Sequence, residues 1–567
     1  MYKISLPLSV SSDKEEWQLE MQFIKKMSPD RVFIAFDTPF FDREMRENTY
    51  KVLKSQIEFF RENGVKEIGL WCWTFMHTDG HLHPEYAKMT GKDGAVGNFC
   101  PSDERFVADT ADLVQNLAGL GADLLMFDDD FRYGWLPSGP GCLCDNHIKM
   151  VSDKVGESLT RQSLASKIFR GGTNKYRDAW LDALKESFIN FSLKMREAAD
   201  KVNPQFRIGL CSCMSVWDQD GADTYEIARA LAGNTKPFCR LIGAPYWGVK
   251  QFFTCRINHV IEQERIELAW KSQENADIEV FTEGDTYPRP RFTTPSSYLE
   301  AFDTVLRADG KSDGILKYAV SYALNGSKNN EYGIGSFEET GYVENHIASR
   351  ELYAKIDEYF GTKVDSGFRI YEFMHKFADS VFPQNRDVSK ETVENQFYSY
   401  AAKALSDNSV PTNYTRTDCP GVAFGENARH LTPQMRKNGL LLDIVAAKIL
   451  HDSGVDVGIT AFNSVSTEDG EPKYEISRAG NRIYYDIYGQ VSATWGNFPT
   501  YDIEISNKAK VLSHTVKLDN AINRVQQYTG TDSYYYENAN GERYVVINCD
   551  MQTTDEYQYR GYCRQAL

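Results

Sequence analysis

Short apolar and β-branched runs alternate with amphipathic stretches from Tyr2 to Ser321. The runs lie at Tyr2–Leu8, Arg31–Phe36, Glu67–Trp73, Asp123–Asp128, Arg207–Ser212, Arg240–Pro245, Asp277–Glu283 and Gly314–Ser321. Stretches with helical spacing lie between them, at Lys14–Lys26, Glu47–Asn63, Ser102–Leu117, Tyr176–Val202, Asp223–Ala232, Arg256–Gln273 and Ser296–Ala308. Strands that alternate with helices predict parallel β-α-β units. This many units over about 320 residues favours a (β/α)8 TIM barrel over an open doubly wound sheet, the structural alternative.

The pattern changes after the barrel. Arg350–Phe360 is predicted as a helix, Gly367–Met374, Gly421–Phe424 and Val455–Ile459 as strands, and Glu391–Ala404 and Asn438–Ser453 as helices. Beyond Gly470 the segments Ile483–Tyr488, Lys510–His514 and Tyr544–Asn548 look like strands, and Asn540-Gly541 is a hairpin turn signal. We therefore expect a barrel over 1–348, a flavodoxin-like α/β domain over 349–470 and a β-rich region over 471–567.

Composition narrows the class of protein. There are 63 Lys and Arg against 80 Asp and Glu, a net charge of −17, which argues against nucleic-acid and anionic-membrane partners. No apolar run approaches the ~20 residues of a membrane span, and the N-terminus lacks the features of a signal peptide. The eleven cysteines are an odd number scattered over a long chain, which is untypical of a disulfide framework. We expect a cytoplasmic location.

Acidic residues follow two of the predicted barrel strands, where such folds carry their function. Asp128, Asp129 and Asp130 end the fourth run, and Glu283 ends the seventh. Carboxylates that face each other across a barrel mouth are what glycoside hydrolysis requires. Three consecutive Asp residues can also cap a helix, bind a cation or be solvated. The position on strands four and seven favours the catalytic interpretation.

Aromatic and charged residues follow most of the same strands. We predict that they bind substrate: Trp73, Arg132, Trp217, Trp247, Asp285, Arg289, Arg291 and Tyr322. Aromatic rings offer flat faces to a sugar, and arginines offer donors to its oxygens. Prolines flank Arg289, so the Pro-Arg-Pro-Arg segment can equally be a rigid surface turn. His77, His81 and His83 are interpreted as a polar loop.

A cysteine-rich segment lies just beyond the acidic triplet. Cys142, Cys144 and His147 form Cys-x-Cys-x2-His, and Cys100 precedes the third predicted helix. These are the ligand types of a closed tetrahedral zinc site. The alternative is a set of buried thiols.

These motifs together resemble the family 42 β-galactosidases of clan A. In that family the acid/base residue follows strand four and the nucleophile ends strand seven. A Cys…Cys-x-Cys-x2-Cys loop binds zinc, and its first Cys is followed by Pro, as Cys100 is followed by Pro101 here. The resemblance implies that Glu283 is the nucleophile, that Asp130 takes the acid/base place and that Asp129 takes the place of the preceding Asn. The chain departs from the family in these aspartates and in His147, which replaces the last Cys ligand.

The resemblance also implies a function and an assembly. We expect a retaining exo-glycosidase that removes a terminal sugar, a β-galactoside or related β-glycoside, from small glycosides or oligosaccharides by double displacement. Structural zinc and no organic cofactor are expected, and the α/β domain is expected to form a homo-oligomer, a trimer by the resemblance. The alternatives are a non-catalytic carbohydrate-binding barrel and a metal-dependent barrel hydrolase that uses Asp128, Asp129 and Asp130 as ligands.

Overall fold

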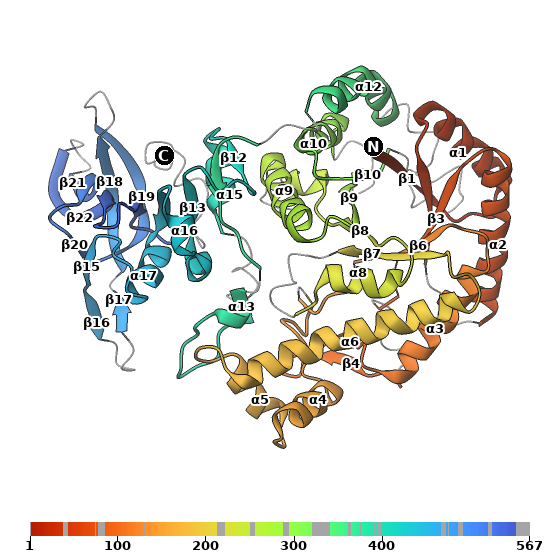
Figure 1. Cartoon of the computed structure of the whole chain (residues 1–567), viewed down its shortest axis with the longest axis horizontal. Helices are drawn as coiled ribbons and strands as arrows, with labels where there is room; N and C mark the ends of the chain where they lie inside the picture. Colours follow the sequence, from red (N-terminus) through yellow and green to blue (C-terminus); the bar gives the residue numbers. More distant parts are fainter. Residues whose placement is uncertain are drawn as a thin grey trace. The chain divides into compact units, whose positions relative to one another are not determined.

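The computed structural model divides the chain into two compact units, shown in Figure 1. The barrel unit comprises Met1–Lys363 and Ser380–Glu394, and the second unit comprises Val364–Asp379 and Asn395–Leu567. The structure describes all residues except 1, 38–42, 74, 77–84, 130, 135, 213–220, 250–255, 287–293, 320–340, 361–364, 375, 391–392, 394–398, 467–471, 475, 486–490, 520–523 and 552–567. Within the described helices, none is both long and apolar enough to span a bilayer.

The first unit is built on a closed barrel of parallel strands. Its strands are β1 (Lys3–Ser9), β2 (Arg31–Phe36), β3 (Glu67–Cys72), β6 (Leu124–Phe127), β7 (Arg207–Ser212), β8 (Phe238–Leu241), β9 (Glu279–Gly284) and β10 (Gly314–Lys317). They close in the order β1-β10-β9-β8-β7-β6-β3-β2. The predicted TIM barrel is confirmed. The sixth strand begins at Phe238 rather than at the predicted Arg240, and it ends before Gly243, whose φ is +145°.

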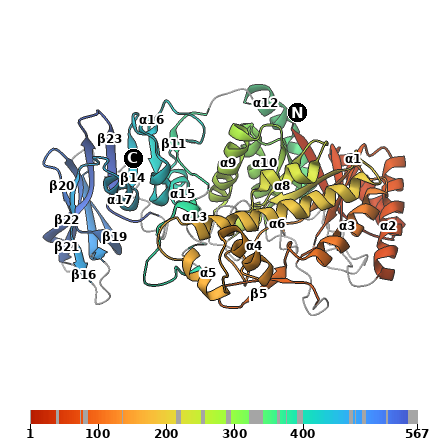
Figure 2. The same cartoon turned by 60° about the horizontal axis from the view of Figure 1, so that its bottom comes forward.

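Helices cover the outside of the barrel. They are α1 (Lys14–Met27), α2 (Arg43–Glu62), α3 (Glu104–Ala118), α4 (Asp145–Val155), α5 (Arg161–Ile168), α6 (Lys175–Asp200), α8 (Thr224–Ala232), α9 (Ile257–Glu274), α10 (Ser296–Asp309) and α12 (Tyr342–Tyr359). Side-chain caps fix several starts, for example at Asp103, whose carboxylate accepts from the backbone of Arg105 and Phe106. A hairpin of β4 (Lys88–Thr90) and β5 (Val96–Phe99) follows β3, and α4 and α5 pack beside α6 (Figure 2).

A charged ring closes the N-terminal end of the barrel. The carboxylate of Glu279 on β9 forms a salt bridge with Arg31 of β2. Nη2 of Arg207 lies 2.9 Å from Oε2 of Glu279, and Nζ of Lys3 lies 3.8 Å from its Oε1. Glu67 on β3 contacts the same three cations, with Lys3 Nζ at 3.3 Å. Burial raises the pKa of Glu279, but Arg31, Arg207 and Lys3 outweigh it and hold the pKa at about 2. The ring therefore joins five strands, β1, β2, β3, β7 and β9, through pairs of opposite charges.

We expect Glu279→Gln to destabilise the barrel unit by about 3–5 kcal/mol, because it leaves the fully buried Arg31 without its closest counter-charge. Urea unfolding measures the change, and Glu67→Gln is the matched control, because its side chain is 24% exposed against 5% for Glu279. The pKa of Glu279 is depressed in the folded state, so its stabilisation is present above an unfolded pKa of about 4.3. It is lost as the pH falls towards about 2. An equal effect of the two substitutions would contradict this assignment.

The second unit contains a nine-stranded sheet. Its strands are β11 (Phe368–Ile370), β12 (Thr412–Asn413), β13 (Gly421–Ala423), β14 (Leu440–Asp443), β18 (Ile476–Tyr485), β19 (Val491–Tyr501), β21 (Lys510–Asp519), β22 (Arg524–Glu537) and β23 (Arg543–Ile547), in the order β12-β11-β13-β14-β23-β22-β21-β18-β19. The first five strands in this order are parallel, and their chain order 2-1-3-4-5 is that of flavodoxin-like sheets. The expected mixed α/β sheet with a β region after it is confirmed.

The remaining elements of this unit are short. They are α13 (Lys376–Asp379), α15 (Ala401–Asp407), the 3-10 turn η3 (Gly425–His430), α16 (Pro433–Arg436), α17 (Ile444–Asp452), β15 (Ile459–Phe462), β16 (Ser464–Ser466), β17 (Pro472–Tyr474) and β20 (Ile503–Ile505). The hairpin signal at Asn540-Gly541 is confirmed between β22 and β23, where Gly541 has a φ of +76°. The strand predicted at Val455–Ile459 is wrong, because β15 begins only at Ile459 and pairs antiparallel with β20.

The helix predicted at Asn438–Ser453 is wrong in its first part. Leu440–Asp443 is the buried strand β14, and the helix α17 begins only at Ile444. Gly439, with a φ of +94°, turns the chain into the strand. The carboxylate of Asp443 accepts from the backbone N–H of Ala446 and so fixes the start of the helix.

Candidate active site and metal centre

A buried salt-bridge network lies at the C-terminal end of the barrel. Glu283, near the end of β9, has Arg240 Nη1 of β8 at 3.2 Å from its Oε1. The hydroxyl of Tyr318 donates to the same oxygen at 3.3 Å and accepts from Arg240. The backbone N–H of Gly243 donates to Oε2 at 3.4 Å. The carboxylate on β9 is therefore held by groups at the ends of its two neighbouring strands, β8 and β10.

The groups around Glu283 bring the pKa of its carboxyl group close to neutral pH. Burial raises its pKa, Arg240 lowers it, and the carboxylates of Asp285 and Asp129 raise it again, to about 7. Glu283 and Asp285 are both buried. The opposed influences of a cation and of other carboxylates are typical of a catalytic centre.

The acidic triplet after β6 is brought to the same network. Asp128 Oδ1 lies 3.5 Å from Arg240 Nη2, so Asp128 and Glu283 share one guanidinium group. Asp129 Oδ2 pairs with Arg132 Nη1 at 3.2 Å, and Asp129 also contributes to the field at Glu283. Asp130, the predicted acid/base, lies outside the described residues.

Aromatic rings line the region around Arg240. The guanidinium carbon of Arg240 lies 5.3 Å from the ring centroid of Trp71. Trp71 makes edge-to-face contacts at 5.8 Å with both Trp73 and Tyr318. Trp247 and Trp73 are half-buried and pack against the core inside the barrel. Of the predicted substrate-binding residues, Trp73, Arg132, Trp247 and Asp285 are described, whereas Trp217, Arg289, Arg291 and Tyr322 lie outside the described residues, as do His77, His81 and His83.

Three members of this network were not predicted from the sequence: Arg240, Gly243 and Tyr318. The signal for Arg240 was present, because a charged residue inside an apolar barrel strand must face a partner. Gly243 is required by its φ of +145°, and a Cβ there would lie 2.1 Å from Oε1 of Glu264. Nothing local distinguishes Tyr318 from the other tyrosines of the chain.

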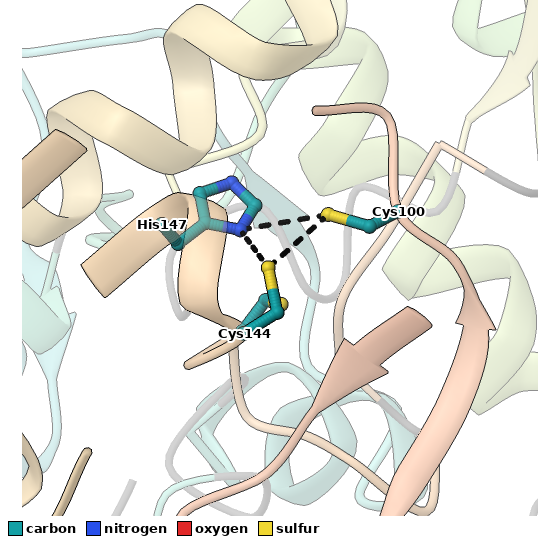
Figure 3. A group of neighbouring side chains, drawn as sticks. Cys100, Cys144 and His147 are labelled. Atoms are coloured by element: carbon teal, nitrogen blue, oxygen red, sulfur yellow. Dashed lines mark hydrogen bonds between the residues drawn. The ribbon is translucent and has the colours of Figure 1, made fainter. Parts of the chain in front are cut away.

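The cysteine-rich segment forms a second centre, shown in Figure 3. Cys100, Cys142, Cys144 and His147 are all buried, and one ligand atom from each lies within 4.8 Å of the others. Cys144 directly precedes α4, and His147 lies in its first turn. Nε2 of His147 pairs with the Ser187 hydroxyl at 2.9 Å, which leaves Nδ1 to face the sulfurs.

The spacing of these atoms can be compared with a tetrahedral metal site. Bonds of ~2.3 Å to sulfur and ~2.0 Å to nitrogen separate two sulfurs by about 3.8 Å and a sulfur from a nitrogen by about 3.5 Å. The Sγ atoms of Cys100 and Cys144 lie 3.7 Å apart, and they lie 3.5 and 3.3 Å from Nδ1 of His147. The cluster can therefore bind a metal ion with little rearrangement.

Comparison with known proteins supports the fold. No protein-family model matches the sequence, and no curated protein sequence matches it. Among solved structures, the β-galactosidase of the Antarctic haloarchaeon Halorubrum lacusprofundi is similar with a TM-score of 0.62 and 12% identity, over 100% of this chain and 89% of that one. A family 42 β-galactosidase from G. stearothermophilus has a TM-score of 0.56 and 11% identity, over 99% and 87%. An exo-β-1,4-mannosidase from Opitutaceae bacterium strain TAV5 has a TM-score of 0.55 and 12% identity, over 100% and 95%. Along its whole length the chain therefore has the fold of the family 42 β-galactosidases, and the expected distant resemblance is confirmed.

Proposed function

We propose that this protein is a retaining exo-glycosidase that removes a terminal sugar from small β-glycosides. The observation that carries the proposal is the buried Glu283 carboxylate, which Arg240 and Tyr318 hold at the C-terminal end of β9. It occupies the strand that carries the nucleophile in the family that the sequence resembles. The solved structures of similar fold include β-galactosidases and an exo-mannosidase.

The proposed reaction is a double displacement. An oxygen of Glu283 attacks the anomeric carbon while the bond to the leaving oxygen breaks, and a carboxylic acid after β6 protonates that oxygen. The same residue, now ionised, takes a proton from water, which attacks the glycosyl ester and releases the sugar and the free Glu283 carboxylate. Arg240 and Tyr318 stabilise the carboxylate before attack and on its release.

We assign the acid/base role to Asp130, with Asp128 and Asp129 as the competing candidates. Asp128 pairs with Arg240 and Asp129 pairs with Arg132. An ion pair favours the ionised form of a carboxyl group. A general acid must carry a proton, so these pairings favour the third aspartate.

The substrate class follows from the rings near the network. Trp73 and Trp247 offer apolar faces to one pyranose ring, and Arg132 offers donors to its oxygens. Trp217, Tyr322, Arg289 and Arg291 complete the proposed sugar site. The names of the similar structures favour a β-galactoside or β-mannoside.

A screen of nitrophenyl glycosides tests the function, with β-galactoside, β-mannoside, β-glucoside and α-arabinoside first. We expect kcat/KM for the best substrate to rise as the pH increases through about 7, because Glu283 attacks only when ionised and its pKa is about 7. The anomer of the first-formed sugar, followed by NMR, must match that of the substrate. Inversion, or no hydrolysis of any glycoside, would overturn the proposal.

The alternatives have less support. A metal-dependent hydrolase needs Asp128 and Asp129 as ligands, but both carboxylates already pair with arginines. A carbohydrate-binding barrel would not require a buried carboxyl group whose pKa lies near neutral pH, as that of Glu283 does. Binding of a sugar without turnover would favour that second alternative.

The metal centre and the assembly belong to the same proposal. We propose structural zinc at Cys100, Cys142, Cys144 and His147, because four protein ligands leave no open position for water. By the resemblance, the α/β domain predicted over 349–470 would assemble the protein as a homo-oligomer, a trimer. We also propose a cytoplasmic location, because the odd number of scattered cysteines is untypical of a disulfide framework.

A further inference from the structure

A buried lysine lies outside the barrel at the end of β10. Nζ of Lys317 is 2.7 Å from Glu300 Oε1 and 2.8 Å from Asp303 Oδ2, both on α10. It is 3.1 Å from Nδ1 of His346 and 3.1 Å from the hydroxyl of Tyr353, both on α12. The Lys317 side chain is completely buried. Its ammonium group therefore joins β10 to two outer helices.

The cluster extends to the start of the chain. The hydroxyl of Tyr2 donates to Asp303 at 3.0 Å, and the guanidinium carbon of Arg307 lies 4.0 Å from the Tyr2 ring centroid. Figure 1 shows α10, α12, β10 and the N-terminus gathered at one side of the barrel. Burial and the charge of Lys317 lower the pKa of His346 to about 3, so its neutral ring accepts the bond from Lys317.

This group of acids and histidine is not available to a metal. Ligand atoms of Glu300, Asp303 and His346 lie within 4.8 Å of one another. The ammonium group of Lys317 already lies within hydrogen-bond distance of all three. The cluster is therefore an anchor for the lysine.

The residue after Lys317 belongs to the candidate active site. Side chains alternate between the two faces of a strand, and Tyr318 points into the barrel, where it contacts Glu283 and Arg240. Tyr318 N–H donates to the Gly284 carbonyl and the Thr286 hydroxyl donates to the Tyr318 carbonyl at 3.4 Å, whereas the register of β10 with β1 runs only to Leu316. The Tyr318 hydroxyl lies 3.3 Å from Glu283, near the long limit of a hydrogen bond. A small displacement of the strand end would break this bond.

We propose that Lys317 is a positioning residue that holds the Tyr318 hydroxyl on Glu283. The proposal rests on the proposed function of Glu283 as the nucleophile. Loss of the donated bond would destabilise the ionised form of Glu283. Lys317 thus affects the reaction indirectly. It fixes the end of β10 from the outer face of the barrel, and the end of β10 fixes Tyr318 on the inner face.

The first test does not depend on activity. The protein is labelled with ring-13C tyrosine, and the Tyr318 resonance is assigned by its absence in Tyr318→Phe. Lys317→Met is expected to shift that resonance, and so is Tyr353→Phe, which keeps the charges and covers the case in which Lys317→Met fails to fold. The matched control is Lys271→Met, because Lys271 is a buried lysine that pairs with Asp313 at the other end of β10, with Nζ at 2.8 Å. An unmoved resonance in both cluster variants, or an equal shift in the control, overturns the proposal.

The second test uses kinetics on the best aryl glycoside. Tyr318→Phe and Lys317→Met are each expected to lower kcat at least tenfold and to move the acid limb of the pH profile to higher pH. The double variant should be no worse than Tyr318→Phe, because both changes remove one interaction. Additive losses would contradict the proposal. If the wild type hydrolyses no glycoside, the proposed function fails while the spectroscopic result still decides the role of Lys317.

Discussion

Replacing Glu283 with glutamine is expected to lower kcat on an aryl β-glycoside by at least about a thousandfold. The amide has nearly the shape of the carboxylate but cannot supply a negatively charged oxygen to the anomeric carbon. The fold should survive, since the glutamine Oε1 can still accept from Arg240 and Tyr318, and only the long bond of 3.4 Å from the Gly243 N–H to Oε2 is lost. Initial rates and thermal unfolding measured on the same preparation separate the two effects.

The control for this substitution is Glu267→Gln, which changes a buried carboxyl group on α9 outside the barrel. It should leave kcat within about threefold of the wild type. Azide added to Glu283→Ala should restore turnover and give a glycosyl azide of inverted configuration, because the small anion attacks from the side that Glu283 vacated. Activity within tenfold of the wild type for Glu283→Gln would remove this residue from the mechanism.

The barrel was predictable because its strands are short apolar runs bounded by polar residues. Arg31–Phe36 and Arg207–Ser212 have the same limits in the pattern and in the structure. Parallel strands in a closed barrel all end on one face, so the residues at the ends of the fourth and seventh strands could be expected to converge. The positions of Asp128 and Glu283 at the ends of predicted strands were therefore enough to predict that they lie at the same end of the barrel.

The strand at Leu440–Asp443 was missed for a physical reason. Its apolar residues continue directly into the apolar face of α17, so one unbroken run serves two kinds of structure. A short run buried on both sides has no period that distinguishes strand from helix. The turn at Gly439 sets the start of the strand, and the cap at Asp443 sets the start of the helix. The pattern of apolar residues reveals neither of them.

The partners of Glu283 could not be predicted in the same way. Tyr318 is unremarkable in its local segment, and it lies 78 positions from Arg240 in the chain. Their role follows from the closure of the barrel, which places β8 and β10 on either side of β9. The charge of Arg240 inside an apolar strand was the one local indication that a buried acid had to lie nearby.

The cluster of possible metal ligands was easier to predict, because Cys142, Cys144 and His147 lie within six consecutive residues and differ in type from their surroundings. Removal of the proposed zinc ion is the second change for which we expect a large effect. A structural zinc ion in a small peptide supplies about 10–16 kcal/mol of folding free energy. In this larger unit we expect part of that loss, seen as a fall of at least about 5 °C in Tm after chelation.

The cause of that loss is the packing of the ligands. The buried sulfurs of Cys100 and Cys144 lie 3.7 Å apart with Nδ1 of His147 beside them, and a bound zinc ion would compensate the charge of neighbouring thiolates and hold these ligands together. The purified protein should contain about one zinc ion per chain by mass spectrometry, and Cys144→Ala should lose it. Cys239→Ala, which removes a buried cysteine of β8 outside the cluster, should keep the ion. Four protein ligands make the zinc structural, so added zinc should restore Tm and, with the fold, activity. A metal-free protein with an unchanged Tm would show instead that the cluster is a set of packed thiols.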